Sequence, residues 1–279
     1  MGMEIFIFIL IVLILVIVYL YFECTFLKID RYKIISDKLP RAFNGYKIAH
    51  ISDFHNTKSV YLKKQILKSL QSDKPDILVI TGDLIDSRRT NMKISLDFIK
   101  QIKNIPIYYV AGNHESRIKE YKIFKEKLRK LKVMVLENEK IQLMKEDSTI
   151  DLIGLQDPSF ETSENNTKEM KVIVNNYLQN LTTKEKFEIL LIHRPELLEI
   201  YAKNNTDLVF CGHAHGGQVV IPFVGPIIAP NQGFFPKLTS GVHHKKNTNL
   251  VISRGIGNSL CPIRINNKPE LIYVTLEKK

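Results

Sequence analysis

Residues able to bind metal ions recur along the chain, in or just after short runs of branched apolar residues. They stand in five stretches, "HISDFH", "VITGDLID", "YVAGNHE", "LLIHRPE" and "CGHAHGGQ". The candidate ligands are Asp53, His55, Asp83, Asn113, His193, His213 and His215. This set offers oxygen and nitrogen donors and no thiolate, so it suits two divalent ions such as Mn, Fe or Zn better than a structural zinc.

Taken singly, each candidate has an ordinary structural explanation. An Asp that follows a strand often caps the next helix, and "GD" or "GN" is common in turns. The spacing argues instead for a shared site, because Asp53, Asp83 and Asn113 follow one another at intervals of 30 residues. Such an interval fits one strand–helix–strand unit, which would bring the ends of three parallel strands side by side.

The stretches between these residues supply the elements that must position them. Short β-branched runs predict buried strands, and apolar residues at helical spacing predict helices that cover them. Strands are predicted at 46–52, 76–81 and 105–111, and helices at 58–72, 91–103, 116–131 and 166–180. After residue 132 short strand patterns dominate. The alternation favours an α/β fold with two packed mixed β-sheets flanked by helices.

The five motifs "DFH", "GDLID", "GNHE", "LLIHRPE" and "GHAHGGQ" resemble, in order, those of the calcineurin-like metallophosphoesterase superfamily over residues 46–276. The tail "ISRGIGNSLCPIRINNKPEL" further resembles the membrane-anchored branch that includes UDP-2,3-diacylglucosamine hydrolases. The resemblance implies a four-layer αββα sandwich. It also implies that one metal is held by Asp53, His55, Asp83 and His215, and that Asp83 bridges to a second metal held by Asn113, His193 and His213.

The resemblance implies a phosphoester hydrolase in which His114, next to Asn113 but not a ligand, is the proton donor or transition-state stabiliser. Two divalent ions about 3.5–4 Å apart can share a water and lower its pKa toward neutrality, which yields a bridging hydroxide for attack on phosphorus. A carboxylate can bridge because it has two oxygens, and Asp83 fits. Candidates for binding the substrate phosphate are Arg88, Arg194 and Arg254, although such arginines are also often solvated or structural.

The first residues predict a membrane anchor. Ile5–Phe22 is an uninterrupted apolar run without charge, Gly or Pro, and at 1.5 Å per residue it spans roughly 27 Å, close to the thickness of a bilayer's hydrocarbon core. We therefore expect a transmembrane anchor at 1–23, a basic juxtamembrane segment at 24–44 and the catalytic domain at 45–279. The basic residues that follow the run favour a cytoplasmic position for that domain at the cell membrane.

Charge and apolar composition bear on the partner. The net charge of +11 favours anionic partners, which include phosphorylated substrates, lipid headgroups and nucleic acid. The apolar, Pro-rich stretch 219–236 is either a buried edge strand with its turns or a membrane-dipping wall beside the metals. Together these features predict hydrolysis of a phosphodiester or diphosphate bond in a lipid-linked substrate such as a UDP-diacylglucosamine-like molecule, with membrane lipids as further partners and no specific nucleic acid.

Two alternatives remain open on the sequence. The first is a nuclease or nucleotide phosphodiesterase, because a basic domain also attracts polynucleotides. Against it, the chain lacks an interleaved aromatic and basic strip for stacking bases. The second is a non-catalytic, metal-bound, lipid-binding protein, which a missing ligand or a missing His114 would favour. All of those residues are present.

Overall fold

The first of two six-stranded sheets contains the three strands predicted in the first half of the chain. The computed structural model describes residues 2–183, 185–258 and 263–279. The sheet has the order β1-β16-β2-β3-β4-β5. Its strands are β1 (Lys28–Ser36), β2 (Lys47–Ile51), β3 (Ile77–Thr81), β4 (Ile107–Val110), β5 (Val133–Val135) and β16 (Glu270–Lys278). Strands β2 to β5 are parallel, so their carboxyl ends lie at one edge.

The second sheet has the order β14-β15-β9-β8-β7-β6. Its strands are β6 (Glu139–Lys145), β7 (Ser148–Gly154), β8 (Glu188–Leu191), β9 (Leu208–Cys211), β14 (Gly241–Lys245) and β15 (Thr248–Ile252). The four inner strands are parallel, and β6 and β14 pair antiparallel at the two edges. Two short ribbons, β10 (Val220–Ile221) with β11 (Gly225–Pro226) and β12 (Ile228–Ala229) with β13 (Gly233–Phe234), lie between β9 and β14 along the chain.

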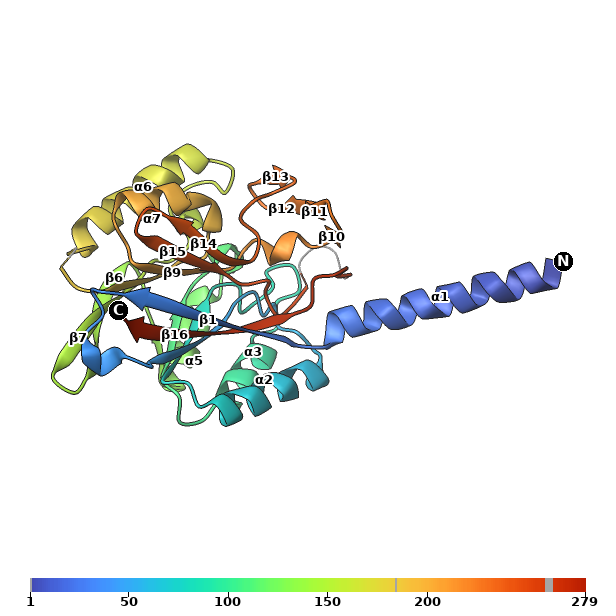
Figure 1. Ribbon diagram of the computed structural model, residues 1–279, viewed down its shortest axis with the longest axis horizontal. Coiled ribbons are helices and arrows are strands. Elements are labelled where there is room, and N and C mark those ends of the chain that lie inside the picture. The colour runs from blue at the N-terminus through green and yellow to red at the C-terminus, as the bar shows by residue number, and fades with distance from the viewer. Residues whose placement is uncertain (1, 184, 259–262) are drawn as a thin grey trace.

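Helices cover the outer face of each sheet (Figure 1). α2 (Val60–Asp73), α3 (Met92–Gln101) and α5 (Tyr121–Lys130) cover the first sheet, and α6 (Thr167–Leu181) and α7 (Leu198–Lys203) cover the second. A further short helix, α4 (Asn113–Ser116), lies in the loop after β4. The helix predicted at 116–131 corresponds to α5, which begins later, at Tyr121. Ser116 instead ends the separate short helix α4 that begins at Asn113. The prediction of two packed mixed sheets flanked by helices is confirmed.

Alternate side chains of a strand point to opposite faces of its sheet and so pack in different layers. In β3, Leu78 and Ile80 pack in the cluster that includes α2 and α3 residues, whereas Ile77 and Val79 pack in the cluster between the two sheets. In the second sheet, Leu190 belongs to the cluster with α6 and α7. Three apolar clusters thus hold four layers together.

The segment 24–44, predicted as a juxtamembrane segment, contains a strand of the first sheet. Strand β1 pairs with β16 from Lys28 to Ser36. Ile34 of this strand and Leu39 and Phe43 beyond it are buried in the cluster between the sheets. The mixed polarity of the strand hides it in the sequence, because only one of its nine residues is fully buried.

Helix α1 (Gly2–Thr25) projects from the domain in Figure 1. In the described part of the chain it is the one helix long and apolar enough to cross a membrane, judged by length and composition. None of its most apolar 18-residue window is buried within the protein. An apolar helix without a protein surface against it requires another apolar environment.

We expect a chain that begins at residue 45 to be much less stable than a chain that begins at residue 26. The shorter chain loses β1 and the buried side chains of Ile34, Leu39 and Phe43, each of which contributes about 1.5–3 kcal/mol. Thermal unfolding of the two soluble chains would measure the difference. Equal melting temperatures would show that β1 is dispensable for the fold.

Candidate metal centre

The ligand stretches of both sheets meet at one place. Asp53 and His55 follow β2 of the first sheet, and Asp83 and Asn113 follow β3 and β4. The other three histidines, His193, His213 and His215, follow β8 and β9 of the second sheet. All seven predicted ligands are buried. The parallel strands of both sheets therefore bring their carboxyl ends to a common site.

Several ligand residues have a left-handed backbone. The φ angle is positive at Asp53, His55, Asp83, His213 and His215, a conformation that costs residues with a Cβ about 1–3 kcal/mol each when the surroundings impose it. Such turns redirect the side chain sharply at the end of a strand. The concentration of strained residues marks the loops as shaped for a function at the expense of stability.

Glycines allow the loops to approach each other. A Cβ at Gly212 would lie 1.9 Å from Ser52 Oγ and 2.3 Å from Asp53 Oδ2, and a Cβ at Gly112 would lie 2.3 Å from Asp83 Oδ1. The first contact joins the two sheets, because Gly212 follows β9 and Asp53 follows β2. A side chain at either glycine would push a ligand loop out of place.

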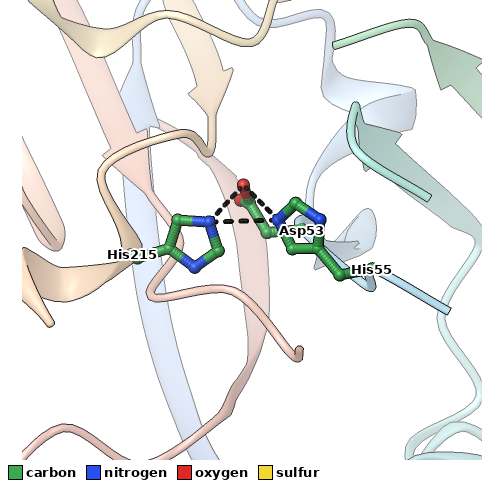
Figure 2. Close-up of side chains that lie close together, drawn as sticks. All are labelled: Asp53, His55 and His215. Carbon is green, nitrogen blue, oxygen red and sulfur yellow. Dashed lines mark hydrogen bonds and ion pairs between the residues drawn. The ribbon is translucent and has the colours of Figure 1, made fainter. Parts of the chain in front are cut away.

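The first ligand cluster consists of Asp53, His55 and His215 (Figure 2). The Nε2 atoms of the two histidines lie 3.1 Å apart, and Nε2 of His215 lies 3.2 Å from Asp53 Oδ1. The Nε2 of His55 lies 3.8 Å from the same oxygen. Two imidazole nitrogens and a carboxylate oxygen that converge in this way fit a divalent ion.

The second cluster consists of Asp53, Asp83 and His193. Nδ1 of His193 lies 2.7 Å from the carbonyl oxygen of Thr81 and donates to it, so Nε2 is the nitrogen that faces Asp83 Oδ2 at 3.3 Å. Burial lowers the pKa of His193, but the carboxylates of Asp83 and Asp53 outweigh it and raise that pKa to about 10. The same two carboxylates favour any cation at this position.

One oxygen of Asp83 lies between the two clusters. Asp83 Oδ2 is 3.3 Å from His193 Nε2 and 3.7 Å from His55 Nε2. The other oxygen, Oδ1, accepts a hydrogen bond of 2.9 Å from the backbone N–H of His114. Asp83 is therefore placed to help hold a divalent ion at either cluster, where it would supply negative charge.

Asn113 and His213 lie beside the second cluster. Asn113 Oδ1 is buried and has no hydrogen-bond partner, as expected of an atom placed to bind a cation. The ring of His213 lies 5.0 Å from that of His193, measured between centroids. Its Nε2 donates to Asn231 Oδ1 at 2.9 Å, which leaves Nδ1 as the nitrogen able to bind a metal.

Asn231 was not predicted from the sequence. Its orientation is fixed because Oδ1 also accepts from Arg194 Nη1 at 3.0 Å and Nδ2 donates to the carbonyl of Glu164 at 2.9 Å. It thereby sets the tautomer of His213. In the sequence it stands in the apolar stretch that follows "GHAHGGQ", where no pattern distinguishes it from an ordinary turn residue.

His114 faces the two clusters without belonging to either of them. The backbone N–H of Ser87 donates to His114 Nδ1 at 3.0 Å, so the ring carries its proton on Nε2, 3.9 Å from Asp83 Oδ2. Burial lowers the pKa of His114, which keeps the ring neutral near pH 7. His114 also groups with His55 and Asp86, but the Asp86 oxygens are paired with Arg88 and Arg89.

Glu115 connects the ligand loops of the first sheet. Its Oε2 accepts backbone hydrogen bonds of 2.8 Å from both Asp83 and Gly112, and its Oε1 accepts one of 3.0 Å from Ile85. The sequence places it in "GNHE" but gives no sign of these contacts. Glu115 is a positioning residue, because it holds the backbone of the loops and touches none of the predicted ligand atoms.

The three predicted substrate arginines have different surroundings. Arg88 lines the site pocket, the cavity bordered by Asp83, Asn113, His114, His213 and His215. Arg194 is fully buried and forms a two-pronged ion pair with Asp157. Arg254 lies 3.6 Å from Glu270 and 3.9 Å from Asp30. Arg88 is itself paired with Asp86, but of the three it is the one that lines the pocket. The geometry therefore favours Arg88 for contact with a substrate and adds Arg117, which lines the same pocket and is paired there with Glu164.

Comparison with known proteins identifies the family. A model described as calcineurin-like phosphoesterase matches residues 46–217. The chain belongs to this family. It is accordingly a metal-dependent phosphoester hydrolase, as the motifs predicted, and its Asp and His clusters are able to bind metal ions.

Three relatives illustrate the range of the family. A metallophosphoesterase of Aquifex aeolicus is 30% identical over 275 residues, 93% of this chain and 95% of its own length. The phosphodiesterase YaeI of Escherichia coli is 25% identical, over 83% of this chain and 82% of its own. A transmembrane protein with a metallophosphoesterase domain from Danio rerio is 26% identical, over 90% of this chain and 57% of its own.

We expect Glu115→Gln to weaken metal binding and to lower the free energy of unfolding by about 1–3 kcal/mol, because an amide N–H₂ then faces a backbone N–H donor. The control is Glu120→Gln on the exposed surface at the start of α5. Thermal unfolding and metal titration by calorimetry would measure both effects. Unchanged metal affinity in the Glu115 variant would contradict the positioning role.

Proposed function

We propose that the protein is a membrane-anchored hydrolase with two divalent ions, drawn from Mn, Fe and Zn, that cleaves a phosphodiester or diphosphate bond in a lipid-linked substrate. One ion would be held by Asp53, His55, Asp83 and His215, and the other by Asp83, Asn113, His193 and His213. The orphaned amide oxygen of Asn113 and the facing nitrogens of His55 and His215 support this assignment. Bound there, two divalent ions would lower the pKa of a shared water and offset the charge on the phosphate oxygens.

The observation that carries the proposal is the tautomer of His114, which has its hydrogen on Nε2. Because Ser87 occupies its Nδ1, the Nε2–H is the hydrogen available to the site pocket. We infer that His114 donates a hydrogen bond from this N–H to the oxygen that leaves phosphorus and so stabilises the negative charge that develops on it, while the neutral ring keeps its proton. Arg88, paired with Asp86, and Arg117, paired with Glu164, border the same pocket and would direct their remaining N–H groups to the phosphate oxygens.

The membrane part of the proposal is supported by α1, which is long and apolar enough to span a bilayer. The name of the Danio rerio relative, a transmembrane protein, agrees with it. The basic residues Lys28, Arg31, Lys33 and Lys38 that follow α1 favour a domain on the cytoplasmic side of the cell membrane. An anchored enzyme has ready access to substrates that are themselves confined to the bilayer.

We expect His114→Ala to lower kcat about 10²–10³-fold on an alkyl phosphodiester, because one preorganised hydrogen-bond donor to the charge on the leaving oxygen is lost. The loss should be much smaller on a p-nitrophenyl ester, whose leaving group is stable as an anion. Steady-state kinetics on the two esters would measure the ratio. His244→Ala, at an exposed histidine of β14, is the control, and equal losses on both esters would refute a hydrogen bond from His114 to the leaving oxygen.

The substrate class calls for a separate comparison. We expect the full chain in vesicles to hydrolyse a lipid-linked diphosphate at least about tenfold faster, in kcat/KM, than a water-soluble diester with the same leaving group, since the bilayer concentrates both partners. Equal rates would overturn the lipid-linked substrate. Faster hydrolysis of single-stranded DNA or RNA than of either would instead support the nuclease alternative.

A further inference from the structure

Exposed apolar side chains gather on the segment 219–235, which contains the ribbons β10–β11 and β12–β13 and is called here the apolar lip. Phe223 is fully exposed, and Phe234 and Phe235 are 72% and 62% exposed. Ile221, Val224 and Ile228 add further exposed apolar surface. The segment contains no charged residue. A set of exposed aromatic residues of this kind indicates an interaction surface.

The two ribbons of the lip are joined to each other. The backbone N–H of Ile227 donates to the carbonyl of Val219 at 3.0 Å, and the N–H of Phe235 donates to the carbonyl of Ile227 at 2.9 Å. The exposed phenylalanines of both ribbons therefore belong to one connected piece of structure.

The lip is tied to α1 by hydrogen bonds. The hydroxyl of Tyr19 donates to Asn266 Oδ1 at 2.9 Å and accepts from the Asn266 backbone N–H at 3.2 Å. The side-chain amide of Asn266 in turn donates to the carbonyl of Val220 in β10 at 3.0 Å. Tyr19 lies within the apolar run that ends at Phe22, so these contacts fix β10 near the level at which α1 would leave a bilayer. In Figure 1, α1 leaves the domain on the side where β10 and β11 lie.

The lip also borders the site pocket. Pro230 and Asn231, in the turn between β12 and β13, line the pocket together with Asp83 and His114. Asn231 is the residue that fixes the tautomer of His213. The same ribbon thus presents apolar side chains outward and polar or small ones to the metal centre.

We propose that the apolar lip inserts into the interface of the bilayer that holds α1, so that the site pocket opens at the level of the lipid headgroups. The inference rests on the proposed membrane anchoring and deepens it, because it names the residues that orient the domain. The bilayer is the partner favoured here, since the hydrogen bonds through Asn266 bring the lip to the end of the apolar helix. Aromatic side chains are stable at this depth.

The chain contains no tryptophan. One introduced tryptophan is therefore the only indole in each variant and reports on its own position. We would compare Phe223→Trp in the lip, Phe8→Trp in α1, and Met144→Trp on β6, which is exposed in the domain. Each full-length variant is reconstituted into phosphatidylcholine vesicles with and without bromine on the acyl chains. Bromine quenches only indoles that reach the apolar layer.

We expect bromine to quench Phe223→Trp and Phe8→Trp and to leave Met144→Trp unchanged. Quenching of Phe8→Trp alone would overturn the lip insertion and leave the anchor in place. Absence of quenching in both would overturn the anchor itself. If the emission maximum of Phe223→Trp is blue-shifted but bromine does not quench its fluorescence, a second copy of the chain covers the lip. The inference is then wrong.

A functional measurement completes the test. The double variant Phe223→Asp with Phe234→Asp should hydrolyse a hexadecyl p-nitrophenyl phosphodiester in vesicles about tenfold more slowly than the unmodified chain, because two charges would oppose insertion. Its rate on soluble bis(p-nitrophenyl) phosphate should stay within about twofold. An equal fall on both substrates would show that the lip supports only the fold of the pocket.

Discussion

Two buried carboxylates, Asp53 and Asp83, impose the constraint on which the rest of the site depends. Burial opposes ionisation of both, yet the imidazoles beside them, His215 next to Asp53 and His193 next to Asp83, hold both pKa values below the usual range. Two adjacent negative charges inside a protein are stable only among hydrogen-bond donors and cations. The backbone N–H groups of His114 and His213 supply part of that compensation, and bound divalent ions would supply the rest.

Neither sheet can satisfy this constraint alone. The first sheet contributes the carboxylates and an amide, and the second contributes three of the four imidazoles. The negative charges of the two carboxylates therefore meet the imidazoles of the second sheet only when the two sheets pack together, through the cluster that includes Val79, Val110 and Leu191. Glycines such as Gly212 allow the contact to be close, and the strained φ angles at the ligands are tolerated because packing on both sides determines them.

The sequence predicts most of the strands and helices of both sheets well, because hydrophobic periodicity is a local signal. It also places the seven candidate ligands at strand ends, and the structure brings them together in one buried place. The roles of Glu115, Ser87 and Asn231 were out of reach, since each depends on contacts with loops distant in the chain. Strand β1 was missed because its exposed face is basic and its pairing partner lies more than two hundred residues away. For the same reason Arg194, which resembled a phosphate ligand, proved to be paired with Asp157 inside the protein.

The position of β16 has a consequence for biosynthesis. Strand β1 is made before every other strand, yet it joins the first sheet only through β16, which follows every other strand along the chain. During translation β1 must therefore remain without its partner strand until β16 can enter between β1 and β2. A chain interrupted before residue 270 leaves the edge of β2 unpaired, and such an edge is a template for aggregation or a mark for proteolysis. The order of the strands thus makes completion of synthesis a condition for completing the sheet that carries half of the metal centre.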